Sequence, residues 1–198
     1  WEDVPSPPDR IVRRLSLRVP QPPERPEGPS EAEARAWSEP DVMFTNFKSW
    51  EDVGQWWWAL SKERLAPSAA VKAEAQRIVA GRASPKEKIE AIAAFVASRI
   101  RYLNVSFGLG RMQPRQAEEV LTNRYGDCKD KHALIAALAS AVGVEVRPVL
   151  VHTVRKDLLD DSPGPQQFDH MISVAPFGKD PVGWLWIDGT NSLALPGY

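Results

Sequence analysis

The segment YGDCKDKHALIAALASAVGV, residues 125–144, decides the fold of this chain. Gly126 permits a tight turn and Asp127 suits an N-cap, so the sequence predicts a helix over residues 128–142. The glycine that follows this run fits the C′ position at which helices commonly end. Cys128, the single cysteine of the chain, therefore lies in the first turn of a long apolar helix.

Two helices with clear boundaries are predicted upstream of this segment. The alanine-rich run 67–80 stops at Gly81. The second helix starts with Ser84 as a capping serine, Pro85 at the first helical position and Glu87 at N3. Its apolar residues recur at steps of three and four, which predicts one buried face: Ile89, Ile92, Val96 and Ile100.

A further helix is predicted ahead of these two, because Ser49 and Asp52 form a weak capping box. It carries four tryptophans: Trp50, Trp56, Trp57 and Trp58. Such a cluster can line a groove for carbohydrate or peptide. We favour the interpretation that it builds the core of the helical layer, which is the commoner use of aromatic residues at helical spacing.

The residues after the cysteine helix change to β-rich runs at 144–151, 171–174 and Trp184–Ile187, separated by Pro, Gly and Asp. No crossover helix lies between these runs, so we expect antiparallel pairing. The predicted fold class is α+β, with N-terminal helices and a Cys-bearing helix packed on an antiparallel sheet.

Residues 1–40 differ in composition from the remainder, because they hold half of the 18 prolines. Proline excludes a helix here, and the alternating run 11–20 is typical of a strand. We predict that residues 1–40 are the end of a preceding β domain and a linker, and that residues 41–198 are a domain of their own. The chain starts at Trp1 with no signal-peptide pattern, so we expect a piece of a longer protein.

The charge balance excludes several classes of function. Lys+Arg 25 against Asp+Glu 26 gives a net charge of −1, with no basic run that would indicate nucleic-acid binding. No stretch approaches the roughly 18 to 20 consecutive apolar residues of a membrane-spanning helix. One cysteine forms neither an intrachain disulfide nor a Cys-rich zinc site.

The position of Cys128 predicts a reactive thiol, because the positive end of a helix dipole stabilises a thiolate. A thiol nucleophile also needs a base and a group that orients the base. His170 begins one predicted strand and Asp188 ends the next, so adjacent antiparallel strands would bring them together. The alternative is a small core cysteine, since free cysteines are among the most buried residues.

The segments YGDCKDKHALIAAL, FDHMISV and WLWIDGT together resemble the core of the bacterial transglutaminase-like superfamily, which uses papain-like cysteine chemistry. The resemblance covers residues 41–191, and the GDCKDK segment is its most distinctive part. It implies Cys128 as nucleophile, His170 as general base and acid, and Asp188 as the orienting carboxylate. Gly189 departs from the family pattern, which usually has Pro after the Asp, and this predicts a looser turn.

The resemblance implies acyl transfer on peptide or amide bonds of a protein or peptide substrate, through a thioester and without a cofactor. We favour hydrolysis, with transamidation of protein glutamine as the second reading and a non-catalytic interaction module that retains the fold as the third. The family's habits imply an exported or periplasmic bacterial protein.

The oxyanion of such a reaction needs backbone and side-chain donors. The backbone N–H of Cys128 is one candidate. Gln113 is a second candidate through its amide, with Tyr102 as a weaker alternative; Gln113 serves equally well as a cap of the short helix predicted over 117–121.

Three further polar residues follow the cysteine on the same helix. His132, at i+4, shares a helix face with Cys128, but no third ligand has metal-site spacing, so we favour a packed or polar residue over a zinc ligand. Lys129 and Lys131 either favour the thiolate or serve packing. For Asp130 we favour a structural ion pair with a lysine or arginine.

Overall fold

A computed structural model describes residues 2–4, 12–14, 45–104, 111–154, 158–178 and 181–191. The chain divides into two units, Trp1–Val42 and Met43–Tyr198. In the first unit, β1 (Glu2–Val4) pairs antiparallel with β2 (Val12–Arg14). β2 lies inside the strand predicted over 11–20, and the rest of that strand and the proline-rich linker lie outside the described residues. The assignment of residues 1–40 to a preceding β domain stays a prediction.

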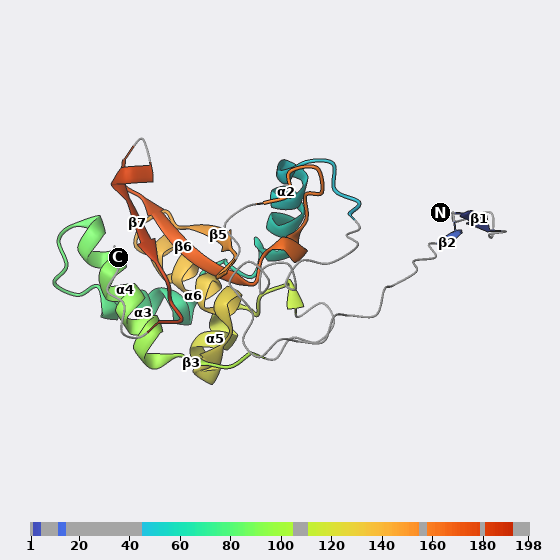
Figure 1. Cartoon of the computed structure of the whole chain (residues 1–198). Coiled ribbons are helices and arrows are strands. Elements are labelled where there is room, and N and C mark those ends of the chain that lie inside the picture. The colour runs from blue at the N-terminus through green and yellow to red at the C-terminus, as the bar shows by residue number, and fades with distance from the viewer. Residues whose placement is uncertain are drawn as a thin grey trace, which may run out of the picture. The chain divides into compact units, whose positions relative to one another are not determined.

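The second unit begins with helices and ends with a sheet (Figure 1). Its helices are α2 (Trp50–Ser61), α3 (Ala69–Ile78), α4 (Pro85–Arg99), α5 (Ala117–Asn123) and α6 (Cys128–Ser140), with short 3-10 helices η2 (Pro165–Gln167) and η3 (Pro181–Gly183). Its strands are β3 (Arg101–Tyr102), β4 (Tyr125–Gly126), β5 (Arg147–Val151), β6 (His170–Pro176) and β7 (Trp184–Ile187). Among the described residues, no helix is long and apolar enough to cross a membrane.

The predicted helix starts are found at the predicted residues. The Ser49 hydroxyl accepts from the Asp52 N–H at 3.2 Å and caps α2. At α4, Ser84 and Glu87 form the full capping box and Pro85 occupies the first turn. The predicted apolar face of α4 is buried: Ile89, Ile92, Val96 and Ile100. Local capping chemistry and periodicity therefore explain where these helices begin and which face they bury.

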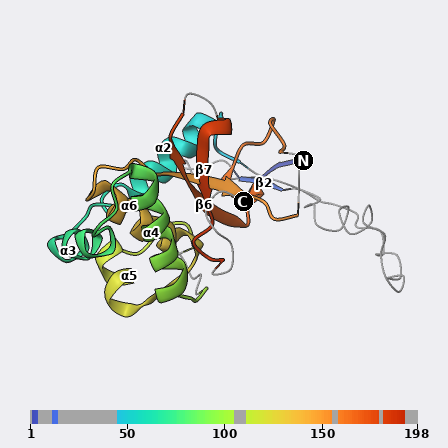
Figure 2. The ribbon, with the colours of Figure 1, turned by 90° about the vertical axis from the view of Figure 1, so that its left-hand side faces the viewer.

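Helix α6 is the centre of the second unit. It packs against α3, α4 and α5, and also against β6. Figure 2 shows α3, α4 and α5 gathered on one side and strands β6 and β7 on the other. The helix ends before Gly143, whose φ of +76° is the left-handed conformation that glycine adopts most readily. Of the four apolar residues that helical periodicity directs inward, Leu134, Ile135 and Leu138 are fully buried in the core, whereas Val142 lies beyond the end of the helix and is only partly buried.

The sheet has the strand order β5-β6-β7, with both pairs antiparallel. Arg147 pairs with Val174 between β5 and β6, and Ser173 pairs with Ile187 between β6 and β7. The predicted α+β class, with the Cys-bearing helix packed on an antiparallel sheet, is confirmed.

One pairing was not predicted. β3 and β4 form a parallel pair in which Arg101 lies opposite Tyr125 and Tyr102 lies opposite Gly126. Strands of two residues show no periodicity, so no pattern in the sequence indicates them. The pair joins the end of α4 to the start of α6 and brings Tyr102 near the cysteine.

Candidate active site

The cysteine opens α6 in the way that the local sequence dictates. The Asp127 carboxylate accepts from the Asp130 N–H at 3.2 Å, and the Asp130 carboxylate accepts from the Asp127 N–H at 3.2 Å, which makes a reciprocal capping box. A Cβ on Gly126 would lie 2.6 Å from the Asp130 Cβ, so the close approach of the turn requires glycine. Cys128 is therefore fixed at the first position of the helix, where backbone N–H groups have no intrahelical acceptor.

Cys128 is more exposed to solvent than its neighbours in the sequence. From Gly126 to Ala139 every residue is buried except Cys128, which is partly exposed. Cys128 is thus the one residue between positions 126 and 139 that is partly exposed, and it lines a hollow of the surface. A purely structural cysteine would be buried with the others.

The two strands that carry the remaining candidates meet as predicted. The His170 Nε2 lies 3.1 Å from an Asp188 carboxylate oxygen. Continuing the register of β6 and β7 past the Ser173–Ile187 pair puts Asp188 diagonal to His170 on the same face of the sheet. The other Asp188 oxygen accepts from the Thr190 N–H at 2.9 Å and from the Thr190 hydroxyl at 2.6 Å, which fixes the carboxylate.

Hydrogen bonds set the charges of this pair. The bond to Asp188, and next the bond to the Cys128 thiol, raise the pKa of His170 to about 10 against the opposing effect of burial. Burial alone would raise the pKa of Asp188, but the bonds from His170 and Thr190 outweigh it and lower that pKa to about 2. At neutral pH the pair is an imidazolium and a carboxylate. Since Nε2 faces Asp188, Nδ1 is the ring nitrogen left for the thiol.

Cys128, His170 and Asp188 therefore lie together, although Cys128 and His170 are 42 positions apart in the sequence and His170 and Asp188 are 18 positions apart. A thiol beside a cationic ring, itself held by a carboxylate, can act as a nucleophile whose base and orienting group are already present.

Two hollows meet at His170. The first has a volume of about 420 Å³ and contains Cys128. Its apolar lining consists of Trp57, Met112, Leu150, Pro165, Phe168 and Met171. The second has a volume of about 610 Å³, and polar side chains line it, including Thr153, Asp169, Asp188 and Thr190. Tyr102, Asp169 and His170 line both hollows.

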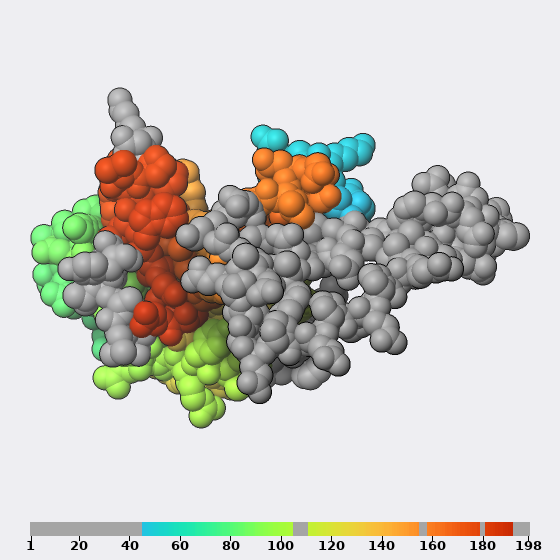
Figure 3. All heavy atoms as spheres, in the orientation of Figure 1, coloured from blue at the N-terminus to red at the C-terminus, as the bar shows by residue number. Residues whose placement is uncertain are grey.

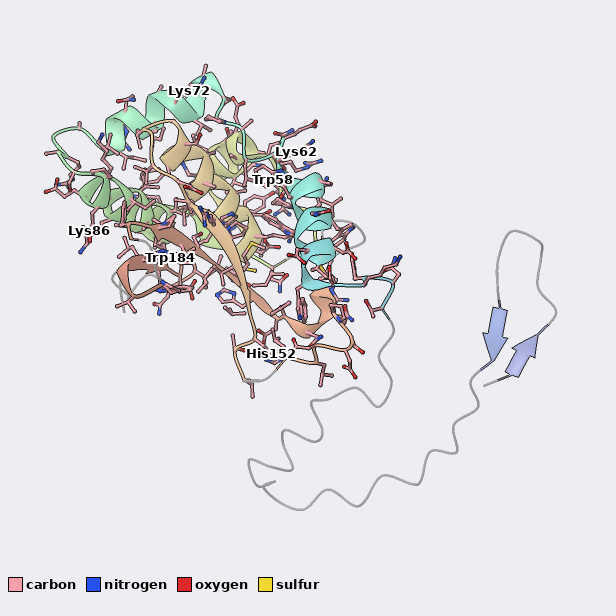
Figure 4. The ribbon with its side chains drawn as sticks, turned by 90° about the horizontal axis from the view of Figure 1, so that it is seen from above. Trp58, Lys62, Lys72, Lys86, His152 and Trp184 are labelled. Atoms are coloured by element: carbon pink, nitrogen blue, oxygen red, sulfur yellow. The ribbon has the colours of Figure 1, made fainter. Side chains whose placement is uncertain are left out.

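The segment between β5 and β6 forms one wall of the first hollow. Figure 3 shows it, in orange, lying against α2 in cyan. The Trp50 indole N–H donates to Asp160 at 3.0 Å, and the rings of Trp50 and Phe168 meet edge to face with centroids 5.6 Å apart. Figure 4 shows His152 just beyond the end of β5, and this residue also lines the first hollow. α2 therefore holds the segment that carries Phe168 beside the thiol.

The two proposed oxyanion donors have different surroundings. The Gln113 amide donates to the Leu60 carbonyl at 3.1 Å, and Gln113 is not among the residues that line the thiol's hollow. Tyr102 lines both hollows, and burial, followed by the negative charges of Cys128 and Asp127, raises the pKa of its phenol. The Gln113 amide thus ties the loop to α2, whereas Tyr102 lines the hollow of the thiol, and the role of either residue as an oxyanion donor stays a prediction.

The four tryptophans of α2 do not all build the core of the helical layer, which was the role favoured from the sequence. Only Trp57 is buried, and it packs beside His132 and lines the hollow of the thiol. Trp58 is 54% exposed and lines a separate hollow with Lys62 and Ala136; Figure 4 labels Trp58 and Lys62 on α2. The cluster is therefore not one core, because four tryptophans within nine residues point to different sides of a helix.

The polar residues that follow the cysteine are buried and partnered. The Lys129 ammonium pairs with Asp127, and the Asp130 carboxylate pairs with the Arg115 guanidinium and accepts the Arg115 N–H at 2.8 Å. The ion pair expected for Asp130 is thus present, with an arginine. These contacts fasten the loop before α5 to the start of α6.

His132 is packed, as expected. Its Nδ1 lies 2.8 Å from the Ser173 hydroxyl, and its Nε2 has no hydrogen-bond partner. Burial lowers the pKa of His132 to about 3, so the ring stays neutral. Within the described ranges, no group of three His, Cys, Asp or Glu side chains is placed to hold a metal ion.

Several residues of the site were not singled out from the sequence. Phe168 and Asp169 line the hollows and directly precede His170, so their position in the FDH run was the available signal. Lys131 was considered only as a source of potential near the thiol. Its amino group instead donates to the Gly189 carbonyl at 3.0 Å, beside Asp188. No sequence pattern joins residues 58 positions apart.

The comparisons with known proteins concern the family and the fold of this chain. The family model described as the transglutaminase-like superfamily matches residues 72–188, which is more than half of the chain. A search of curated proteins finds no match. A crystal structure described as a putative protease from Parabacteroides distasonis has the same fold over 76% of this chain and 31% of its own, at 15% identity and a TM-score of 0.53.

A second crystal structure, described as a putative cysteine protease from Cytophaga hutchinsonii, aligns over 65% of this chain and 41% of its own, at 20% identity and a TM-score of 0.47. The chain thus spans about a third of the first of these proteins and two fifths of the second.

Proposed function

This chain belongs to the transglutaminase-like superfamily, and from that premise we propose that it catalyses cysteine-dependent acyl transfer on peptide or amide bonds, with hydrolysis as the favoured outcome. Cys128 is the nucleophile, His170 the general base and acid, and Asp188 the group that orients His170. The observation that carries the proposal is the position of His170, which lies 3.1 Å from Asp188 and lines the same hollow as Cys128.

The reaction follows from the charges of these groups. The imidazolium of His170 stabilises the Cys128 thiolate, and the thiolate attacks the carbonyl carbon of the amide. As the tetrahedral intermediate collapses, His170 gives its proton to the departing amine and a thioester remains on Cys128. His170, now neutral, takes a proton from water, whose oxygen attacks the thioester. The acid product leaves, and the proton on His170 restores the starting pair.

The oxyanion of the intermediate needs donors aimed at the carbonyl oxygen. The N–H of Cys128 lies in the first turn of α6 and has no acceptor within the helix. The Tyr102 hydroxyl, on the adjoining β3, is the second donor we propose in place of Gln113. Each such donor contributes about 10²- to 10³-fold to the rate in comparable acyl-transfer sites.

Hydrolysis is favoured because Cys128 is partly exposed and polar side chains line the second hollow, so water can reach the thioester. The neighbour of the same fold described as a putative protease points in the same direction. Transamidation differs only in the nucleophile that takes the acyl group. The substrate is a protein or peptide, and export from the cytoplasm stays a prediction.

The first test is pH-dependent labelling of the single cysteine with iodoacetamide. A thiolate stabilised by an imidazolium reacts at pH values where an ordinary thiol, with a pKa of ~8.5, is protonated. At pH 6 we expect the folded chain to react at least about tenfold faster than the same chain unfolded in urea. His170→Ala should remove this advantage, and Asp188→Asn should reduce it. Equal rates for the folded and unfolded chains would favour the non-catalytic interaction module.

A second test separates the two reactions. A glutamine-containing peptide is offered with and without a lysine-like amine, and the products are measured by mass spectrometry with Cys128→Ser as the control. Cleavage or deamidation alone indicates hydrolysis. An amine adduct that outcompetes water would assign transamidation instead.

A further inference from the structure

Lys131 is a buried lysine on the nucleophile's own helix. Its residue is 2% exposed, and it lies one turn after Cys128 on α6, at i+3. Side chains three residues apart share a face of a helix, so Lys131 extends from the same side of α6 as the thiol. Lysines are almost never fully buried without a partner.

The partner of Lys131 belongs to the turn that carries Asp188. The Lys131 ammonium donates to the Gly189 carbonyl at 3.0 Å, and Gly189 directly follows Asp188. The turn lies close to the helix, because a Cβ on Gly189 would be 2.8 Å from the Ile135 Cδ1 and 3.6 Å from the Lys131 Cβ. The glycine at this position therefore allows a close approach to the helix, and the looser turn expected from it stays a prediction.

The negative charge of Asp188 compensates part of the cost of burying the Lys131 ammonium. Val96 and Ile135 lie around the same turn, and an ammonium buried among apolar side chains is costly unless an opposite charge compensates. Burial lowers the pKa of Lys131, and the negative charge of Asp188 acts against this shift. Among the described residues, the other titratable groups near Asp188 include Asp169 and His170 at the start of β6, Cys128 from α6 and Tyr102 from β3.

We propose that Lys131 is a positioning residue of the acyl-transfer site, which fastens the Asp188 turn to the helix of the thiol and keeps Asp188 directed at His170. This inference rests on the proposed function and adds a fourth residue to it. The helix that presents Cys128 thereby also fixes the position of the Asp188 carboxylate. Both ends of the Cys128–His170–Asp188 triad are therefore held by α6.

The position of the lysine distinguishes this role from general packing. A packing residue at this place needs only apolar volume, which methionine supplies with nearly the same length. The ammonium adds a hydrogen bond to the residue after Asp188 and a positive charge that the negative charge of Asp188 favours. Loss of the ammonium should therefore change the reactivity of Cys128 even where the fold persists.

The experiment is the labelling profile of Cys128 between pH 4 and 10 for the wild-type chain, Lys131→Met and Lys131→Arg. Lys131→Met removes both the donor and the charge, so we expect the midpoint of its profile to move to higher pH and the rate at pH 6 to fall about tenfold, equivalent to ~1.4 kcal/mol of lost stabilisation. Lys131→Arg keeps the charge and should recover part of this rate. If Lys131→Met does not fold, Lys131→Leu, which likewise removes both the donor and the charge, carries the same test.

Two controls isolate the positioning role. Leu138→Ala destabilises the same helix from a fully buried site remote from the Asp188 turn, so its folded fraction should keep the wild-type midpoint. In the Asp188→Asn background, Lys131→Met should add little, because its effect passes through Asp188. A Lys131→Met midpoint equal to that of the wild type, or a full additional shift in the Asp188→Asn background, would overturn the inference. A wild-type chain that labels like an ordinary thiol would instead refute the proposed function itself.

Discussion

The two halves of α6 are equally buried and chemically opposite. Residues 133–139 are all apolar and buried, and five of them belong to the hydrophobic core. The stretch 127–132 contains Asp127, Lys129, Asp130, Lys131 and His132, and each of these five is at most 6% exposed. One half of the helix thus contributes to folding by removing apolar surface from water. The other half buries charges, and this is stabilising only where partners compensate the lost hydration.

This difference indicates that the polar half of α6 positions the groups around the thiol. Asp127 and Lys129 pair with each other. Asp130, Lys131 and His132 each contact a different element, namely Arg115 before α5, Gly189 after β7 and Ser173 in β6. The partly exposed Cys128 lies in the middle of this set. The apolar half holds the helix in place, and the polar half aligns the segments around the thiol.

The largest expected effect comes from breaking the polar half. Asp130→Ala removes the ion pair with Arg115 and the cap of the Asp127 N–H, so we expect about 4 kcal/mol of lost unfolding free energy, the range for a broken buried pair. Urea denaturation measures it. Glu119→Ala is the matched control, because it removes the exposed partner of the same arginine and should cost at most about 0.5 kcal/mol. Equal losses would show that the buried pair has no special role.

A change in the apolar half should have a slightly smaller effect on stability and none on chemistry. Leu138→Ala leaves a cavity in the core, and we expect a loss of about 3 kcal/mol in the same urea experiment. The iodoacetamide profile of the folded protein should be unchanged. A shifted profile would indicate that the two halves are not independent.

Gly189 contacts both halves, through Lys131 and Ile135. Gly189→Ala brings a Cβ to 2.8 Å from the Ile135 Cδ1, and we expect a loss of about 1.5 kcal/mol, at the low end for overpacking because the end of the isoleucine can rotate. The variant should also slow the labelling of Cys128 at pH 6, since it pushes the Asp188 turn from the helix. A thermal unfolding scan together with the labelling rate tests both. Lost stability with an unchanged labelling rate would show that the turn need not touch the helix.

The smallest effect is the dependence of stability on pH. The pKa of His170 is raised to about 10 in the folded state, so its ion pair stabilises the fold fully below the ordinary histidine pKa of 6.5, and this contribution is lost as the pH rises through 10. Because Asp188 is 34% exposed, solvent screening limits the contribution to about 1 kcal/mol. We expect the wild type to lose this amount between pH 7 and 10 relative to His170→Gln. Parallel declines of both proteins in urea titrations would contradict it.

Much of the fold could be predicted from the sequence because its signals are local. The caps at Ser49, Ser84 and Asp127, the periodic face of α4 and the stop at Gly143 each depend on residues within a few positions of one another. The β3–β4 pair could not be predicted, because two-residue strands show no pattern. The roles of the four tryptophans depend on what lies opposite each face of α2, and no local signal contains that information.

The sequence by itself determined the order of the helices and of the three sheet strands, the helix start that carries Cys128, the strand that His170 begins and the strand that Asp188 follows. Only the tertiary structure decided that Gln113 faces α2 while Tyr102 faces the thiol, and that Lys131 reaches the residue after Asp188. The physical reason is the separation along the chain over which each interaction acts. Capping and periodicity act between neighbours along the chain, whereas burial, ion pairing and hydrogen bonding at the site join segments that meet only when the core has formed.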